Sequence, residues 1–161
     1  YFPAAVNSLR LRGDKATADR YLAKAREMGA QWEKDAREGD HYKLAFDRPD
    51  TWSQKYNIIW DKIWGTNVFS PKVIDRELKY YLTKQNKYGL PLDSRKDYTK
   101  TDWIMWTAAM AKDTKTFLQF VDPVCDWSNT KTAKMQGFKA RSVIGGYWMR
   151  VLVDKLNSKK Q

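Results

Sequence analysis

Residues 14–39 read DKATADRYLAKAREMGAQWEKDAREG, and this stretch decides the fold class. Its apolar side chains recur at spacings of three and four, with charged residues between them: Leu22, Ala25, Met28, Trp32 and Ala36. That spacing places them on one face of an α-helix, and Asp14 is a typical N-cap residue. We therefore predict an amphipathic helix from Asp14 to near Gly39, whose apolar face packs on a partner.

The same periodicity recurs along the rest of the chain, while strand-like alternation is confined to short pieces such as residues 41–46. In the last predicted helix, the side chains expected to face inward are Val143, Tyr147, Val151 and Leu152. One further helix is predicted in the first dozen residues. Five more are predicted to begin at Ser53 (ending at Gly65), Ser70-Pro71, Thr101 (to Ala111), Thr114 (to about Val121) and Ser142.

Composition sets limits on the function. The chain has 161 residues, of which 42 % are apolar and 14 % aromatic, so it can bury a core. A single cysteine and a single histidine, Cys125 and His41, exclude an internal disulfide, a Cys-rich zinc site and a multi-histidine metal cluster, and we expect neither metal nor cofactor. The net charge of +11 comes from lysines spread over helix surfaces, so nucleic-acid binding is only a minor alternative. No apolar run approaches the roughly 20 residues of a membrane span.

Two long polar and aromatic connections, residues 39–51 and 86–100, separate the predicted helices. Ordered connections of this length are usually functional. They share four similar positions at an offset of 46, among them Asp47 with Asp93 and Trp52 with Tyr98, which suggests a repeated unit of loop and helices, as in arrays of helical hairpins.

Seven of the eight tryptophans divide into two groups. Trp52, Trp103 and Trp127 stand at predicted junctions of loops and helices, where an aromatic face can stack on a ligand; packing at a helix start is the alternative. Core packing is expected for the others at helical spacing: Trp32, Trp60, Trp64 and Trp148.

Acid–base chemistry would need carboxylates, and Asp47, Asp93 and Asp102 are the candidates. Asp102 begins a predicted helix beside Trp103, where aromatic surroundings can raise the pKa of a carboxyl group. The alternative role for Asp102 is a first-turn carboxylate that the helix dipole stabilises. Gly145 and Gly146 are expected to permit close helix packing.

Several longer strings resemble the C-terminal part of the glutaminase A family: residues 39–47 (GDHYKLAFD), 51–57 (TWSQKYN), 60–62 (WDK), 81–93 (YLTKQNKYGLPLD), 102–103 (DW) and 137–147 (GFKARSVIGGY). The resemblance covers residues 13–156. It implies an (α/α) toroid of the six-hairpin glycosidase type, a glutamine amidohydrolase activity and an extracytoplasmic (secreted or periplasmic) location.

The chain departs from the family in three respects. A full toroid needs about twelve helices, whereas the sequence predicts six or seven. The family's Asp-Asp-Phe-Ala-Gly stretch is absent, and the segment between Asp122-Pro123 and Asp126-Trp127 is shorter. We therefore expect residues 1–161 to form a single partial domain, roughly half of an all-α toroid, with a segment missing near 123–127 and with the remainder of the same polypeptide as its partner.

The sequence thus predicts a glutaminase-like hydrolase whose site lies among the long loops. Asp102 is the expected acid or base, Trp52 and Trp103 are expected walls, and the polar groups expected to orient a substrate are Lys55, Asp93, Arg95 and Arg141. A carbohydrate-active or glycan-binding protein on the same scaffold, with a glycan as ligand, and a non-catalytic helical scaffold are the alternatives.

Overall fold

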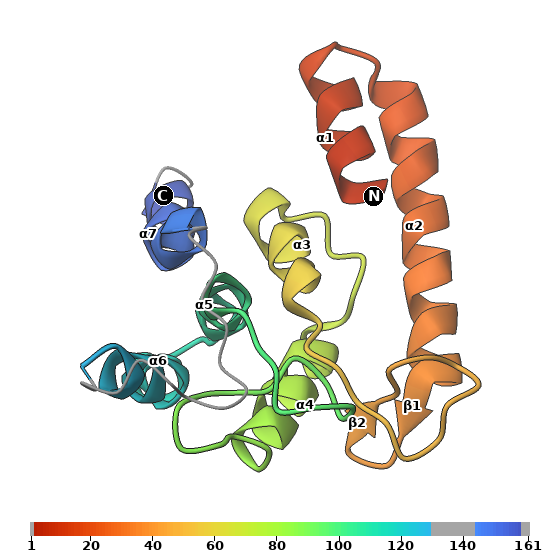
Figure 1. Ribbon diagram of the computed structural model, residues 1–161. Helices are drawn as coiled ribbons and strands as arrows, with labels where there is room; N and C mark the ends of the chain where they lie inside the picture. The colour runs from red at the N-terminus through yellow and green to blue at the C-terminus, as the bar shows by residue number, and fades with distance from the viewer. Residues whose placement is uncertain (1, 130–143, 159–161) are drawn as a thin grey trace.

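A computed structural model describes residues 2–129 and 144–158. This part of the chain is all-α except for one hairpin whose two strands have two residues each (Figure 1). In chain order the elements are α1 (Phe2–Leu11), α2 (Lys15–Ala36), β1 (Arg37–Glu38), β2 (His41–Tyr42), the 3₁₀ helix η1 (Tyr56–Ile58), α3 (Ile59–Trp64), α4 (Pro71–Leu82), α5 (Thr101–Ala109), α6 (Thr114–Ser128), the 3₁₀ helix η2 (Ile144–Trp148) and α7 (Met149–Ser158). None of the described helices is long and apolar enough to cross a membrane.

The helices form an inner and an outer arc. α3 contacts α1 on one side and α5 on the other, and α5 also contacts α7. Figure 1 shows α2, α4 and α6 lying outside this row, each next in the chain to an inner helix. Such alternation of inner and outer helices is the arrangement of an (α/α) toroid, and the predicted fold class is confirmed.

α3 and α5 run parallel. Tyr56, just before α3, stacks on Trp103 in the first turn of α5, with ring centroids 4.3 Å apart. At the other end, the Lys62 ammonium in α3 donates to the carbonyls of Ala109 and Met110 at the end of α5. We call the end with the helix starts and the long connections the loop end, and the end with the short connections 65–70 and 110–113 the turn end.

The predicted α2 is confirmed. Asp14 is its N-cap and accepts a hydrogen bond from the backbone N–H of Thr17 (3.1 Å). The helix ends at Ala36, and Gly39 adopts a φ of 58° in the turn between β1 and β2. Met28, expected on the inward face, is instead 48 % exposed.

The helix predicted to begin at Ser53 begins later. Residues 52–54 are extended and pair with the second long connection: the Gln54 N–H donates to the Leu92 carbonyl (2.8 Å) and the Ser94 N–H to the Trp52 carbonyl (3.0 Å). These bonds hold residues 52–54 in an extended conformation, which the first turn of a helix cannot adopt. The predicted end is right, since Gly65 closes α3 in the left-handed conformation with a φ of 63°.

α5 begins at Thr101, but Lys100 holds the N-cap position predicted for Thr101, and it makes no side-chain cap. α6 continues to Ser128, past the predicted end at Val121 and through Pro123. Proline at this position leaves the carbonyl of Gln119, four residues earlier, without a helical partner. The Gln85 side chain donates to that carbonyl (2.8 Å), so the helix can continue.

The predicted inward face of the last helix is wrong. Tyr147, Val151 and Leu152 are 38 %, 57 % and 39 % exposed, whereas Met149 and Val153 are buried. Residues 144–148 form a 3₁₀ helix with about three residues per turn, so the register differs from that of a continuous α-helix. Trp148, expected in the core, is 66 % exposed. Ser142 and Val143 lie outside the described residues.

Candidate functional site

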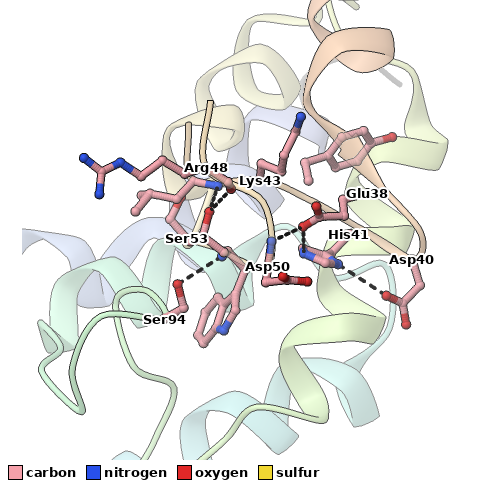
Figure 2. Close-up of polar contacts among 12 residues, drawn as sticks. Glu38, Asp40, His41, Lys43, Arg48, Asp50, Ser53 and Ser94 are labelled. Carbon is pink, nitrogen blue, oxygen red and sulfur yellow. Dashed lines mark hydrogen bonds and ion pairs between the residues drawn. The ribbon is translucent and has the colours of Figure 1, made fainter. Parts of the chain in front are cut away.

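The two long connections meet at the loop end. Beside the backbone bonds of residues 52–54, Ser53 and Asp93 form an isolated antiparallel bridge, and the Ser94 hydroxyl accepts from the Trp52 N–H (3.2 Å; Figure 2). The buried Gln54 side chain donates to the Leu90 and Pro91 carbonyls (3.1 and 2.9 Å) and accepts from the Thr107 hydroxyl of α5 (3.0 Å). The strand-like segments are therefore fixed to each other and to an inner helix.

The tip of the first connection folds back on the β1–β2 hairpin. Glu38 accepts a hydrogen bond from the Asp50 N–H (2.9 Å) and lies 3.3 Å from the His41 ring (Figure 2). Residues 45–50 are exposed, and Asp47 is among them. Asp93 is instead buried, so Asp47 and Asp93 occupy unlike environments despite their similar places in the two connections.

A cavity of about 540 Å³ opens at the loop end and extends along α3. Its polar lining includes Ser53, Lys55, Asn57 and Asp93, and its apolar walls come from residues of α2, α3 and the connections. The aromatic members of the lining are Trp32, Tyr56, Trp60, Trp64, Phe69 and Trp103. Its volume lies within the range of about 300–1,000 Å³ typical of small-molecule sites.

Asp93 and Arg95 form a bidentate ion pair beside this cavity. The guanidinium donates through Nε to Asp93 Oδ1 (3.0 Å) and through Nη2 to Oδ2 (2.6 Å), and the Arg95 backbone N–H also donates to Oδ1 (2.9 Å). Burial alone would raise the pKa of Asp93, but these hydrogen bonds and the positive charge hold it below its ordinary value. Asp93 is therefore an ionised carboxylate, and Arg95, which is largely exposed, has further N–H groups that this ion pair leaves unused.

Lys55 lines the cavity, but its ammonium is occupied by the first connection. It lies within hydrogen-bond distance of the carbonyls of Tyr42, Lys43 and Ser53 (3.1–3.3 Å) and of the Ser53 hydroxyl (2.9 Å). Burial lowers the pKa of Lys55, and Glu77 and Asp93 offset part of this shift. Lys55 therefore shapes the wall of the cavity more than it presents a charge to a ligand.

Glu77 of α4 supports this wall from beneath and is 1 % exposed. Its carboxylate accepts from the Tyr42 N–H (2.8 Å) and from the Tyr81 hydroxyl, and that hydroxyl accepts from the Lys55 N–H (2.8 Å). Burial raises the pKa of Glu77, and Lys55, Tyr81, Tyr42 and His41 only partly offset it. The sequence interpretation missed Glu77, although a charged residue in the apolar row Val73, Glu77, Tyr81 is a usable signal.

Neither predicted tryptophan wall offers a free ring face. Trp52 is 7 % exposed, packs against Tyr80 and Tyr81, and does not line the cavity, so its predicted role is wrong. Trp103 does line the cavity, but Tyr56 stacks on its ring and the Lys100 ammonium lies 3.6 Å from the ring centre. The Tyr56 ring and the Lys100 ammonium cannot fit on the same face of the indole, so the two faces of Trp103 are covered. Trp127 lies in the last turn of α6 and not at a helix start.

Asp102 lies in the first turn of α5, beside the cavity wall and not in it. It is 6 % exposed, and its Oδ1 has no hydrogen-bond partner among the described residues. The backbone of η2 passes directly over it: a Cβ added to Gly146 would lie 2.7 Å from the Asp102 Cβ. The other buried polar atoms that have no described partner in this region are Thr99 Oγ1, Thr101 Oγ1 and Trp106 Nε1.

The remaining predicted site residue, Arg141, lies outside the described residues. Among residues 2–129 and 144–158, no cluster of three potential metal-binding side chains occurs. The structure thus brings Lys55, Asp93, Arg95 and Trp103 together at the loop end, places Asp102 next to them under η2, and removes Trp52 from the site.

The helical hairpins form an inner and an outer arc, and the polar residues lie where the long connections meet. This arrangement defines the chain as part of an α/α-toroid domain. It belongs to the Glutaminase A six helical-hairpin domain family, which matches residues 4–151.

Two relatives are similar to parts of the chain. Glutaminase A of Aspergillus oryzae (strain ATCC 42149 / RIB 40) is 38 % identical over 73 residues, which is 45 % of this chain and 11 % of the relative. Probable glutaminase/05536 of Arthroderma benhamiae (strain ATCC MYA-4681 / CBS 112371) is 26 % identical over 184 residues, covering 88 % of this chain and 21 % of the relative. The chain therefore spans a small part of the length of either relative. No solved structure matches it.

Proposed function

We propose that this chain forms part of a hydrolase that releases ammonia from the side-chain amide of glutamine. Two relatives named as glutaminases support this reaction. The ion pair of Asp93 and Arg95 beside the cavity carries the proposal, because a free amino acid has both charges. The carboxylate can hold the α-ammonium group, and the unused N–H groups of Arg95 can hold the α-carboxylate.

Asp102 is the proposed acid–base residue of this reaction. Hydrolysis of an amide needs a group that takes a proton from water and returns one to the leaving amine. Asp102 supplies a buried carboxyl group at the loop end with one oxygen that no described residue occupies. Buried oxygens without a partner are rare in folded proteins, and functional carboxylates are among the usual reasons. Because η2 covers Asp102, substrate access requires η2 to shift at Gly146.

A glycan-binding function would need exposed aromatic faces on which sugar rings can stack. Trp52 is buried and both faces of Trp103 are covered, so two of the three tryptophans that suggested stacking on a ligand offer no face to a sugar ring. The proposal of glutamine therefore rests on the ion pair of Asp93 and Arg95 and on the two relatives named as glutaminases.

The direct test measures both products on the intact protein that contains this chain. We expect ammonia release from glutamine and no reducing-sugar release from a panel of glycans. Sugar release without ammonia would replace the proposed reaction with the carbohydrate-active alternative. If a protein shown to be folded releases neither product, the remaining interpretation is a non-catalytic scaffold.

A further inference from the structure

Tyr81 has one hydroxyl proton and two acceptors for it. Its oxygen contacts the Glu77 carboxylate and lies 2.8 Å from the Ser53 carbonyl. A hydroxyl group donates one hydrogen bond at a time. The same oxygen accepts from the Lys55 N–H, which leaves the proton free to point to either acceptor.

The protonation state of Glu77 determines which acceptor receives the proton. An ionised carboxylate can only accept, so it draws the Tyr81 proton to itself and leaves the Ser53 carbonyl without it. A neutral carboxyl group donates to the Tyr81 oxygen instead, and Tyr81 then donates to Ser53. Tyr81 is fully buried and its pKa is raised well above the ordinary value, so the hydroxyl keeps its proton in both states.

Ser53 connects this choice to the proposed site. It is bridged to Asp93, and its carbonyl and hydroxyl both contact the Lys55 ammonium. We propose that Glu77 is a positioning residue of the loop end, whose protonation switches the Tyr81 hydrogen bond between Glu77 and Ser53 and so adjusts the segment that holds Asp93. The switch itself stands on contacts within the chain, and its effect on the reaction rests on the proposed function.

The groups that act on Glu77 come from three places. Lys55, directly before η1, contributes its charge, His41 and Tyr42 contribute from β2, and Tyr81 contributes from α4 itself. Burial, the largest influence, favours the neutral form and raises the pKa of Glu77, so the switch operates above the ordinary glutamate range.

Nuclear magnetic resonance of the intact protein that contains this chain, with selective isotope labels, tests the switch without any substrate. The Gln54 amide is attached to the Ser53 carbonyl, so its chemical shift reports a hydrogen bond received there. We expect the ¹³C shift of the Glu77 carboxyl and the Gln54 amide shift to change with the same midpoint, above pH 4.5. In Glu77→Gln, Oε1 can accept from Tyr42 and Nε2 can donate to Tyr81, which imitates the neutral state, so the step at Gln54 disappears.

Two further variants make the test specific. Tyr81→Phe removes the hydroxyl, so Glu77 still titrates but Gln54 does not follow it. Glu27→Gln, at a largely exposed glutamate of α2, keeps the step. A step at Gln54 that persists in Glu77→Gln would assign it to another group such as His41 and overturn the proposal, as would a Glu77 titration that Gln54 ignores.

Kinetics then test whether the switch reaches the substrate. In the intact protein, the KM for glutamine should depend on pH with the Glu77 midpoint, and Glu77→Gln should remove this dependence while kcat keeps its pH profile. An unchanged KM profile, despite the Gln54 step, would overturn the positioning role. If the parent releases no ammonia, the proposed function fails, and the spectroscopic result still decides the switch.

Discussion

Two half-buried lysines, Lys55 just before the inner helix α3 and Lys62 within it, make different contacts at the two ends of the helix. At the loop end, Lys55 contacts carbonyls of an irregular segment. At the turn end, Lys62 donates to the carbonyls of Ala109, Met110 and Ala111, which close α5. The last carbonyls of a helix lack helical partners, so a side-chain donor there satisfies acceptors that the helix leaves free.

The contrast separates stability from function in this fold. The turn end consists of short connections, with Gly65 and Lys62 ending the two inner helices. The loop end has long connections held by single side chains such as Gln54 and Glu77, and it contains the cavity and the Asp102 oxygen that has no partner among the described residues. Changes at the loop end should therefore affect activity, and changes at the turn end should affect stability.

The largest expected effect is on turnover. Asp102→Asn keeps the size of the side chain and removes its charge and proton exchange, so we expect kcat for glutamine in the intact protein to fall at least about a hundredfold. The thermal midpoint should stay nearly unchanged. Asp126→Asn, an exposed aspartate of α6, is the matched control and should retain parental turnover. Turnover within a few-fold of the parent in Asp102→Asn would return Asp102 to the role of a helix-start carboxylate.

The adjacent glycines of η2 provide a matched pair at the loop end. Gly146→Ala places a methyl group within 3 Å of Asp102 backbone and Cβ atoms, so we expect a loss of about 2 kcal/mol in the free energy of unfolding from the forced shift. Gly145→Ala meets nothing within 4 Å and should cost little. Urea unfolding of both variants measures the difference. Equal stabilities would contradict the close approach of η2 to α5.

At the turn end, Lys62→Met keeps most of the apolar stem and removes the ammonium. The carbonyls of Ala109 and Met110 then lose their side-chain hydrogen-bond donor, so we expect a loss of about 1.5 kcal/mol in the free energy of unfolding, with kcat unaffected. Lys72→Met on the exposed face of α4 is the control, measured in the same urea titration. A drop in kcat without a stability change would reverse the assignment of the two ends.

The smallest expected effect is the pH dependence of the stability that Lys62→Met removes. Burial lowers the pKa of Lys62 in the folded chain, with a further contribution from Arg150. Between the lowered value and the ordinary 10.5, the unfolded chain binds more protons, so this lysine makes folding more favourable as pH rises. The stability difference between parent and Lys62→Met should therefore grow as the pH rises toward 10.5. A difference that shrinks would contradict the lowered pKa.

Periodicity and helix-end residues predicted the helices well where each was an ordinary α-helix. Asp14, Gly65 and Ser70-Pro71 mark ends that the structure confirms, because their signals are local. The failures have non-local causes. Ser53 is committed to the second connection, and α6 passes Pro123 because Gln85, from a distant segment, serves the Gln119 carbonyl.

The site was predictable in its location more than in its members. The long connections marked the loop end, and Lys55, Asp93 and Trp103 are there. The sequence could not show that Trp52 turns into the core or that Lys100 covers Trp103, since both depend on packing between distant segments. Gln54 left no motif because its partners are two backbone carbonyls and a threonine hydroxyl far along the chain, and Glu77 was marked only by its place in an apolar row.

The exposed tip of the first connection offers a place to add sequence. Its two ends are held together by the Leu44 N–H, which donates to the Thr51 hydroxyl (3.3 Å), while residues 45–50 project into solvent. Lengthening a closed loop costs little, about 0.6 kcal/mol for each doubling of its length. An epitope or a fluorescent label inserted between Phe46 and Asp47 would therefore lie close to the cavity and interrupt no helix. Its signal would report conformational changes at the loop end.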